Sequence, residues 1–197
     1  MQLFYRFIRR LAWLIGLVLY RIKVTGVENI PKSGRFLLCG NHIHAFDPVV
    51  LAIVSKRQLR FMAKKQLFEG RLIGWFMRKM GAFPIDRGST DMTAFRKSLD
   101  ILKREHGLLI FSQGTRMKDF EDAKAGVAVF ALKTSAPIIP VGIRGSYRFR
   151  STIYIDIGEP ISMLEHEGKK VKSELVDEVM EVVVNRVSAL VKSLPPA

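Results

Sequence analysis

The chain has 197 residues, enough for one domain with a sizeable core, and its 48% hydrophobic and 25% charged residues exclude a disordered chain. Lys and Arg number 32 against 18 Asp and Glu, so the net charge is +14, which attracts anionic lipid, nucleic acid or an acidic protein. The single cysteine, Cys39, excludes a disulfide framework and a cysteine-based metal site.

Residues 1–23 are predicted to form an amphipathic helix that associates with a membrane surface. The uninterrupted apolar run, Leu11–Tyr20, covers roughly 15 Å as a helix, about half of a bilayer core, so it is too short to span. No small-residue cleavage site follows it, so a signal peptide is not predicted. The alternative is a helix docked on the core of this protein. If the segment is helical, its apolar side chains lie along one side of the helix. These residues are Phe4, Phe7, Ile8, Leu11, Leu14, Ile15 and Val18.

Residues 24–197 alternate apolar runs with amphipathic stretches, a pattern that predicts a single α/β domain with a mixed β-sheet flanked by helices. Strands are predicted at Arg35–Cys39, Leu59–Ala63, Gly81–Ile85, Leu108–Ser112, Ile138–Ile143 and Thr152–Ile157. Helices are predicted at Pro48–Ser55, Leu72–Met80, Asp91–Glu105, Ala125–Thr134 and from about Val171 to Val191.

Three polar stretches come at or just after predicted strand ends: N-H-I-H-A-F-D (41–47), D-R-G-S-T (86–90) and Q-G-T-R (113–116). Open α/β sheets bind ligands beyond the carboxyl ends of their strands. We therefore expect these loops to converge on one site. The second stretch also reads as a helix start, which favours an anion.

The first stretch allows three interpretations. His42, His44 and Asp47 resemble the start of the metal motif H-x-H-x-D-H, but the spacing is longer by one residue and no histidine comes directly after Asp47, so no metal is predicted. Asp47 before Pro48 is also typical of a helix cap. In the third interpretation, His42 ends a strand and the turn folds its imidazole onto the carboxylate of Asp47. The carboxylate then orients the ring, which takes a proton from a substrate hydroxyl.

The stretch resembles the N-H-x-x-x-x-D block (HX4D motif) of the glycerophospholipid acyltransferases, especially the lysophosphatidate acyltransferases. The segment M-A-K-K-Q-L-F (Met62–Phe68) also resembles that family. Any one block has low specificity, but four in the family's order across roughly residues 24–160 are a strong signal. The other three blocks are G-A-F-P-I-D-R (Gly81–Arg87), F-S-Q-G-T-R (Phe111–Arg116) and I-I-P-V (Ile138–Val141).

The resemblance implies transfer of a fatty acyl chain to the sn-2 hydroxyl of lysophosphatidic acid, which forms phosphatidic acid in phospholipid biosynthesis. The acyl thioester donor is carried by acyl carrier protein or CoA, and no cofactor is implied. His42 would be the general base and Asp47 its orienting partner. The expected substrate-binding residues, several of them for the acceptor phosphate, are Arg87, Gly114, Thr115, Arg116, Lys64 and Gln113.

Two residues depart from the family pattern. Gln113 stands where the third block usually has glutamate, so a carboxylate role there is in doubt. His44 stands where Ser or Thr is common, and it could contact phosphate or compete as the base. The alternatives are an acyltransferase for another lipid hydroxyl, or a catalytically weak basic protein of the membrane surface.

The expected partners are the two substrates, acidic acyl carrier protein and an anionic membrane surface. Nucleic acid is not expected, because the positive charges are dispersed and no recognised motif appears. The expected location is the cytoplasmic face of the cell membrane, as a monotopic or peripheral protein.

Overall fold

The computed structural model describes residues 2–86, 91–113 and 120–196. Within these residues a seven-stranded mixed sheet runs in the order β1-β7-β6-β2-β5-β3-β4. Neighbouring strands are parallel except β6 and β7, which are antiparallel. The strands are β1 (Arg21–Thr25), β2 (Phe36–Asn41), β3 (Leu59–Lys64), β4 (Ala82–Ile85), β5 (Gly107–Gln113), β6 (Ile138–Gly145) and β7 (Thr152–Ile157).

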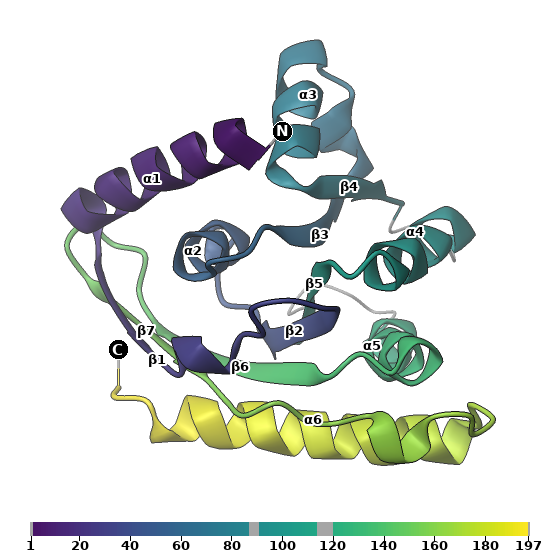
Figure 1. Cartoon of the computed structure of the whole chain (residues 1–197). Coiled ribbons are helices and arrows are strands. Elements are labelled where there is room, and N and C mark those ends of the chain that lie inside the picture. Colours follow the sequence, from purple (N-terminus) through teal and green to yellow (C-terminus); the bar gives the residue numbers. More distant parts are fainter. Residues whose placement is uncertain (1, 87–90, 114–119, 197) are drawn as a thin grey trace.

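Helices cover both faces of the sheet, with α1 and α2 on one side and α4, α5 and α6 on the other (Figure 1). The α-helices are α1 (Gln2–Leu19), α2 (Asp47–Val54), α3 (Arg71–Met80), α4 (Met92–Lys103), α5 (Phe120–Thr134) and α6 (Ser173–Ser193). The predicted α/β domain with a mixed sheet flanked by helices is confirmed, because each predicted strand and helix overlaps an observed one.

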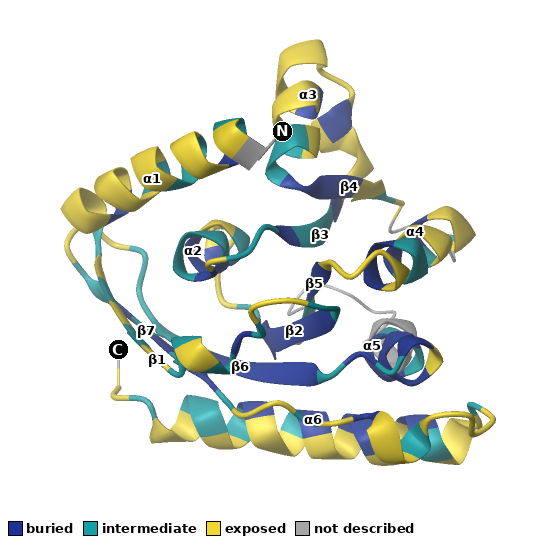
Figure 2. Cartoon of the chain, in the orientation of Figure 1, coloured by how far each residue is buried: buried dark blue, intermediate teal, exposed yellow. Residues whose placement is uncertain are grey.

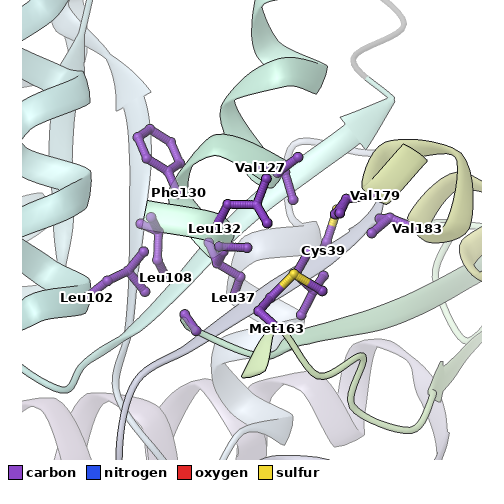
Figure 3. Packing of buried hydrophobic residues seen from close by; sticks show 14 of the residues in the cluster. Leu37, Cys39, Leu102, Leu108, Val127, Phe130, Leu132, Met163, Val179 and Val183 are labelled. Atoms are coloured by element: carbon purple, nitrogen blue, oxygen red, sulfur yellow. The ribbon is translucent and has the colours of Figure 1, made fainter. Parts of the chain in front are cut away.

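The central strand β2 explains why the core has two halves. Its side chains alternate between the sheet faces, as the pleat requires. Leu37 and Cys39 pack into the cluster beneath α4, α5 and α6 (Figure 3). Phe36 and Leu38 pack with Val50 of α2 on the opposite face. A strand covered on both faces is expected to be apolar, and β2 is buried along its whole length, with Asn41 at its end as the one polar residue.

The N-terminal segment differs from the prediction at its end. The helix α1 stops at Leu19, before the expected boundary at residue 23, and Arg21–Thr25 form the edge strand β1. Strand β1 pairs in parallel with β7. The residues R-I-K-V-T alternate polar and apolar, and Ile22 and Val24 pack against the core. The prediction placed Arg21 and Lys23 within the helix of residues 1–23, so this period-two pattern was not recognised.

Candidate active site

The carboxyl end of β2 is fixed by the side chain of Asn41. Its amide accepts from the backbone N–H of Ile143 at 2.7 Å and donates to the carbonyl of the same residue at 2.8 Å. The register of β2 against β5 also shifts between Gly40 and Asn41, so that Asn41 lies opposite Gln113. Such a shift re-aims the residue that follows. The loop that begins at His42 is therefore held to both β6 and β5.

His42 and Asp47 are in direct contact. The ring nitrogen Nδ1 of His42 lies 2.7 Å from Oδ2 of Asp47. The carboxylate is completely buried, whereas the imidazole side chain keeps 30% of its exposure. The ring of His42 also stacks on Phe111 of β5, with centroids 4.2 Å apart. Since Nδ1 is engaged, Nε2 is the nitrogen that remains for a substrate hydroxyl.

The carboxylate of Asp47 is surrounded by donors from the loop before α2. Its Oδ2 accepts from the backbone N–H groups of Ile43, at 2.7 Å, and of His44, at 2.8 Å. The interpretation of Asp47 as a cap of α2 is therefore wrong. Asp47 lies inside the first turn, the N-cap position belongs to Phe46, and the carboxylate points back to the loop. These bonds fix the loop and hold Oδ2, the same oxygen that contacts His42.

Tyr147 completes the surroundings of Asp47, and it was not among the predicted site residues. Its hydroxyl donates to Oδ1 of Asp47 at 2.5 Å, across 100 positions of the chain. Burial and the bond to Asp47 raise the pKa of Tyr147, so its phenol stays protonated as a donor. No spacing rule links residues so far apart. The only local hint was a polar aromatic residue two positions after the end of β6.

The side chain of His44 does not contact the carboxylate that holds His42. Its ring stacks on Tyr147, with centroids 4.3 Å apart, and its Nδ1 accepts from the N–H of Phe46 at 3.3 Å. Only its backbone N–H reaches Asp47. His42 is therefore the histidine with an orienting carboxylate. Among the described residues, no group of three or more His, Cys, Asp or Glu side chains could hold a metal ion.

The other predicted site residues are described only in part. Lys64 ends β3, is exposed and lies opposite Ile85, the last residue of β4. Gln113 ends β5 beside Asn41, but its side chain lies outside what the structure describes. The strand ends of β2, β5, β3 and β4 thus follow one another along one edge of the sheet. The remaining predicted residues, Arg87, Gly114, Thr115 and Arg116, lie outside the described residues.

The start of α4 differs from the predicted anion site. The helix begins at Met92, and the carboxylate of Asp91 accepts from the N–H groups of Thr93 and Ala94, each at 2.9 Å. The N–H of Asp86 also donates to it at 3.0 Å. These amide donors hold the pKa of Asp91 below its usual value. A side-chain carboxylate therefore already occupies this helix N-terminus, where a substrate anion was expected.

Comparison with known proteins identifies the family. The Acyltransferase family model matches residues 21–144, which is more than half of the chain. The chain belongs to the acyltransferase family. The matched residues include the His42–Asp47 pair and the strand end that carries it, so the predicted family and the predicted enzyme class are both confirmed.

Relatives of this acyltransferase carry a more specific name. The 1-acyl-sn-glycerol-3-phosphate acyltransferase of Streptococcus pneumoniae is 31% identical over 198 residues, which are 94% of this chain and 71% of that protein. The enzyme of the same name from Bacillus subtilis is 31% identical over 125 residues, 63% of each chain. The crystal structure of the 1-acyl-sn-glycerophosphate acyltransferase PlsC from Thermotoga maritima shares the fold. Its TM-score is 0.72 at 24% identity, over 98% of this chain and 81% of that one.

Proposed function

We propose that this acyltransferase moves a fatty acyl chain from a thioester to the sn-2 hydroxyl of lysophosphatidic acid, and so forms phosphatidic acid. The observation that carries the proposal is the 2.7 Å contact between His42 and a fully buried Asp47 at the carboxyl edge of the sheet. The substrate class comes from the names of the relatives in Streptococcus pneumoniae and Bacillus subtilis. The reaction belongs to phospholipid biosynthesis.

The dyad supplies general-base catalysis in this mechanism. Nε2 of His42 takes the proton as the hydroxyl oxygen attacks the thioester carbonyl, and the buried carboxylate of Asp47 stabilises the imidazolium. The tetrahedral intermediate then expels the thiolate, which takes the proton back from His42. The histidine ends each cycle neutral, and the acyl group has passed from sulfur to oxygen. No cofactor enters these steps.

The donor is acyl carrier protein or CoA carrying the acyl chain as a thioester. Both carriers are anionic, and a chain with a net charge of +14 attracts either. For the acceptor phosphate, we assign Arg87 and Arg116 as the main ligands. Guanidinium groups present a fixed fork of donors that suits phosphate oxygens. Further candidate ligands for the substrates are Lys64, Gln113, Gly114 and Thr115.

Replacing either arginine should weaken binding of the acceptor more than binding of the donor. Loss of one charge-assisted contact costs about 1.5–3 kcal/mol, so Arg87→Ala and Arg116→Ala should each raise KM for lysophosphatidic acid about 10- to 150-fold. KM for the thioester should change little. Steady-state kinetics with each substrate varied in turn measure both effects. An unchanged KM for the acceptor in both folded variants would show that other residues hold the phosphate.

The proposed location is the cytoplasmic face of the cell membrane, with attachment through α1. This helix docks on α2 through Tyr5, whose hydroxyl lies 3.5 Å from the carbonyl of Ala52. The apolar side chains on its other side are left uncovered. Among the described residues, no helix is long and apolar enough to cross a membrane. The exposed apolar residues of α1 are Leu3, Phe7, Leu11, Trp13, Leu14, Ile15, Leu17, Val18 and Leu19.

Product analysis with several acceptors tests the proposed reaction. Purified protein in detergent receives acyl-CoA or acyl carrier protein thioester together with lysophosphatidic acid, glycerol 3-phosphate or lysophosphatidylcholine. Phosphatidic acid should be the main product, and its formation should require lysophosphatidic acid. A faster reaction with either other acceptor would assign the enzyme to another lipid hydroxyl.

A further inference from the structure

The helix α3 has several large apolar side chains exposed to solvent. Leu72 is 84% exposed and Ile73 is 61% exposed, and Trp75, Phe76 and the preceding Leu67 are also exposed. The helix stands at one end of the molecule, and most of its ribbon is exposed (Figure 2). Contiguous exposed apolar side chains on a soluble protein mark a contact with a partner or a membrane.

The exposed side chains of α3 continue the apolar surface of α1. The rings of Phe4 and Trp75 meet edge to face, with centroids 5.4 Å apart, so the two helices are in contact. Both helices lie at the same end of the molecule, far from α6 (Figure 1). Together their exposed apolar side chains form one surface, which we call the α1–α3 surface.

The charge of the α1–α3 surface identifies its occupant. Neither helix contains Asp or Glu, whereas α1 carries three arginines and α3 carries two arginines and a lysine. The ammonium group of Lys79 lies 5.7 Å above the ring of Trp75, so charge and aromatic surface are interleaved. Apolar and aromatic side chains bordered by cations suit the interface of an anionic bilayer. An acidic protein would match the charge alone.

We infer that α3 is a second membrane-contacting element, which enters an anionic phospholipid bilayer beside α1. This inference extends the attachment proposed for α1, but it rests on different side chains. The two helices are far apart in the sequence, and neither of these described helices is long and apolar enough to cross a membrane. Two contacts fix the orientation of the protein on the bilayer as well as its distance from it. One helix alone would leave the body free to rotate about it.

Trp75 can report directly on this contact. The chain has two tryptophans, Trp13 and Trp75, so Trp13→Phe leaves Trp75 as the only one. When phosphatidylglycerol vesicles are added to this variant, its emission should shift to shorter wavelength, and brominated lipids should quench it. Vesicle binding without a change in Trp75 emission would overturn the inference. The same shift at rising protein concentration without vesicles would show that α3 meets a second copy of the chain instead.

Matched pairs of substitutions measure the contribution of each helix. Leu72→Ser with Ile73→Ser should lower the vesicle partition coefficient about 10- to 100-fold, because two large apolar side chains no longer leave water. Leu14→Ser with Val18→Ser tests α1 in the same way. The control is Leu164→Ser with Val182→Ser, exposed apolar residues away from α1 and α3, which should leave partitioning unchanged. If the α1 pair weakens binding and the α3 pair behaves like the control, α3 is not a membrane contact.

A second inference concerns Tyr147. The carboxylate of Asp47 has two oxygens: Oδ2 receives His42 and two backbone N–H groups, whereas Oδ1 receives the hydroxyl of Tyr147. This hydroxyl comes from the loop after β6, whereas the other donors come from the loop between β2 and α2. The rings of His44 and Tyr20 pack against the ring of Tyr147 and fix its position.

The geometry points to Tyr147 as a positioning residue for the dyad. The phenol holds the carboxylate plane so that Oδ2 stays in line with Nδ1 of His42. In this role its effect on the reaction passes through Asp47. This role rests on the proposed function, in which His42 is the base.

Tyr147→Phe removes only the hydroxyl. Loss of a hydrogen bond to a charged group should lower kcat about 10-fold, with KM for both substrates nearly unchanged. The melting temperature should fall by a few degrees, because Oδ1 of the buried Asp47 carboxylate loses its donor. The control is Tyr20→Phe, the same change in a ring whose centroid lies 5.5 Å away, which should leave kcat unaltered. If Tyr147 had only a structural role, Tyr147→Phe would lower the melting temperature and leave kcat unchanged. Wild-type kcat in Tyr147→Phe would overturn the inference while the proposed function stands.

An NMR readout separates the two proposals. The hydrogen-bonded Nδ1 proton of His42 should give a downfield imidazole signal in the wild type. It should broaden or shift upfield in Tyr147→Phe, even if the protein transfers no acyl chain to lysophosphatidic acid. The same signal in both proteins would show that Tyr147 does not position the dyad. Absence of acyl transfer by the wild type would instead refute the proposed function.

Discussion

His42→Ala should reduce the turnover number for acyl transfer by roughly 10² to 10⁴, the usual contribution of a general base. The imidazole is the group that contacts the buried carboxylate and still reaches solvent. Its removal leaves the acceptor hydroxyl protonated at the moment of attack. The Michaelis constants should change much less than kcat, because the substrates are held elsewhere. Steady-state kinetics beside a melting curve measure the effect.

His44→Ala is the matched control for this result. His44 lies two positions away, but its side chain stacks on Tyr147 and does not meet a carboxylate side chain in the described residues. It should retain a rate within about tenfold of the wild type, since no proton transfer depends on it and only its packing against Tyr147 is lost. If His44→Ala abolished acyl transfer while His42→Ala stayed near the wild-type rate, the base would be His44.

Asp47→Asn should also lower kcat severely, by roughly 10² to 10⁴, since the amide lacks the charge that stabilises the imidazolium and can present the wrong hydrogen-bonding group to the ring. The fold should survive better than in Asp47→Ala. The amide oxygen of Asn can still accept from Ile43 and His44, whereas Ala leaves several part-buried donors without an acceptor. We expect Asp47→Ala to lower the free energy of unfolding by about 3 kcal/mol or more. Chemical denaturation of the two variants checks the difference.

The double variant tests whether the two residues act as a unit. His42→Ala with Asp47→Asn should turn over about as slowly as His42→Ala alone, because removing the orienting group matters only while the base is present. If the loss in the double variant equalled the product of the losses in the two single variants, Asp47 would contribute to catalysis by a route other than His42.

The sequence predicted the central sheet well because burial leaves a clear signature. Strand β2 is apolar at Phe36–Cys39 since both of its faces are covered. The contact between His42 and Asp47 was also predictable, because a strand end and a helix start within one short loop allow few arrangements. Strand β1 was missed, since an edge strand with one covered face carries only a weak alternating pattern.

Contacts between segments far apart in the chain could not be predicted from the sequence. Nothing in the local pattern of Tyr147 shows that it meets Asp47, because that contact depends on how the loop after β6 lies against the loop after β2. The same holds for Asn41, whose amide is bonded to Ile143 on a neighbouring strand. The role of Asp47 as a helix cap was mispredicted for a related reason. A cap and a loop anchor share the pattern Asp-Pro, and only the position of the donors separates them.

The most direct test is the rate of phosphatidic acid formation by purified wild-type protein and by His42→Ala under identical conditions. Lysophosphatidic acid and an acyl thioester are supplied in detergent, and both released thiol and product are quantified. The proposed mechanism predicts equal amounts of thiol and phosphatidic acid from the wild type, and a rate at least about 100-fold lower from the folded variant. Equal rates in the two proteins, or thiol release without phosphatidic acid, would contradict it.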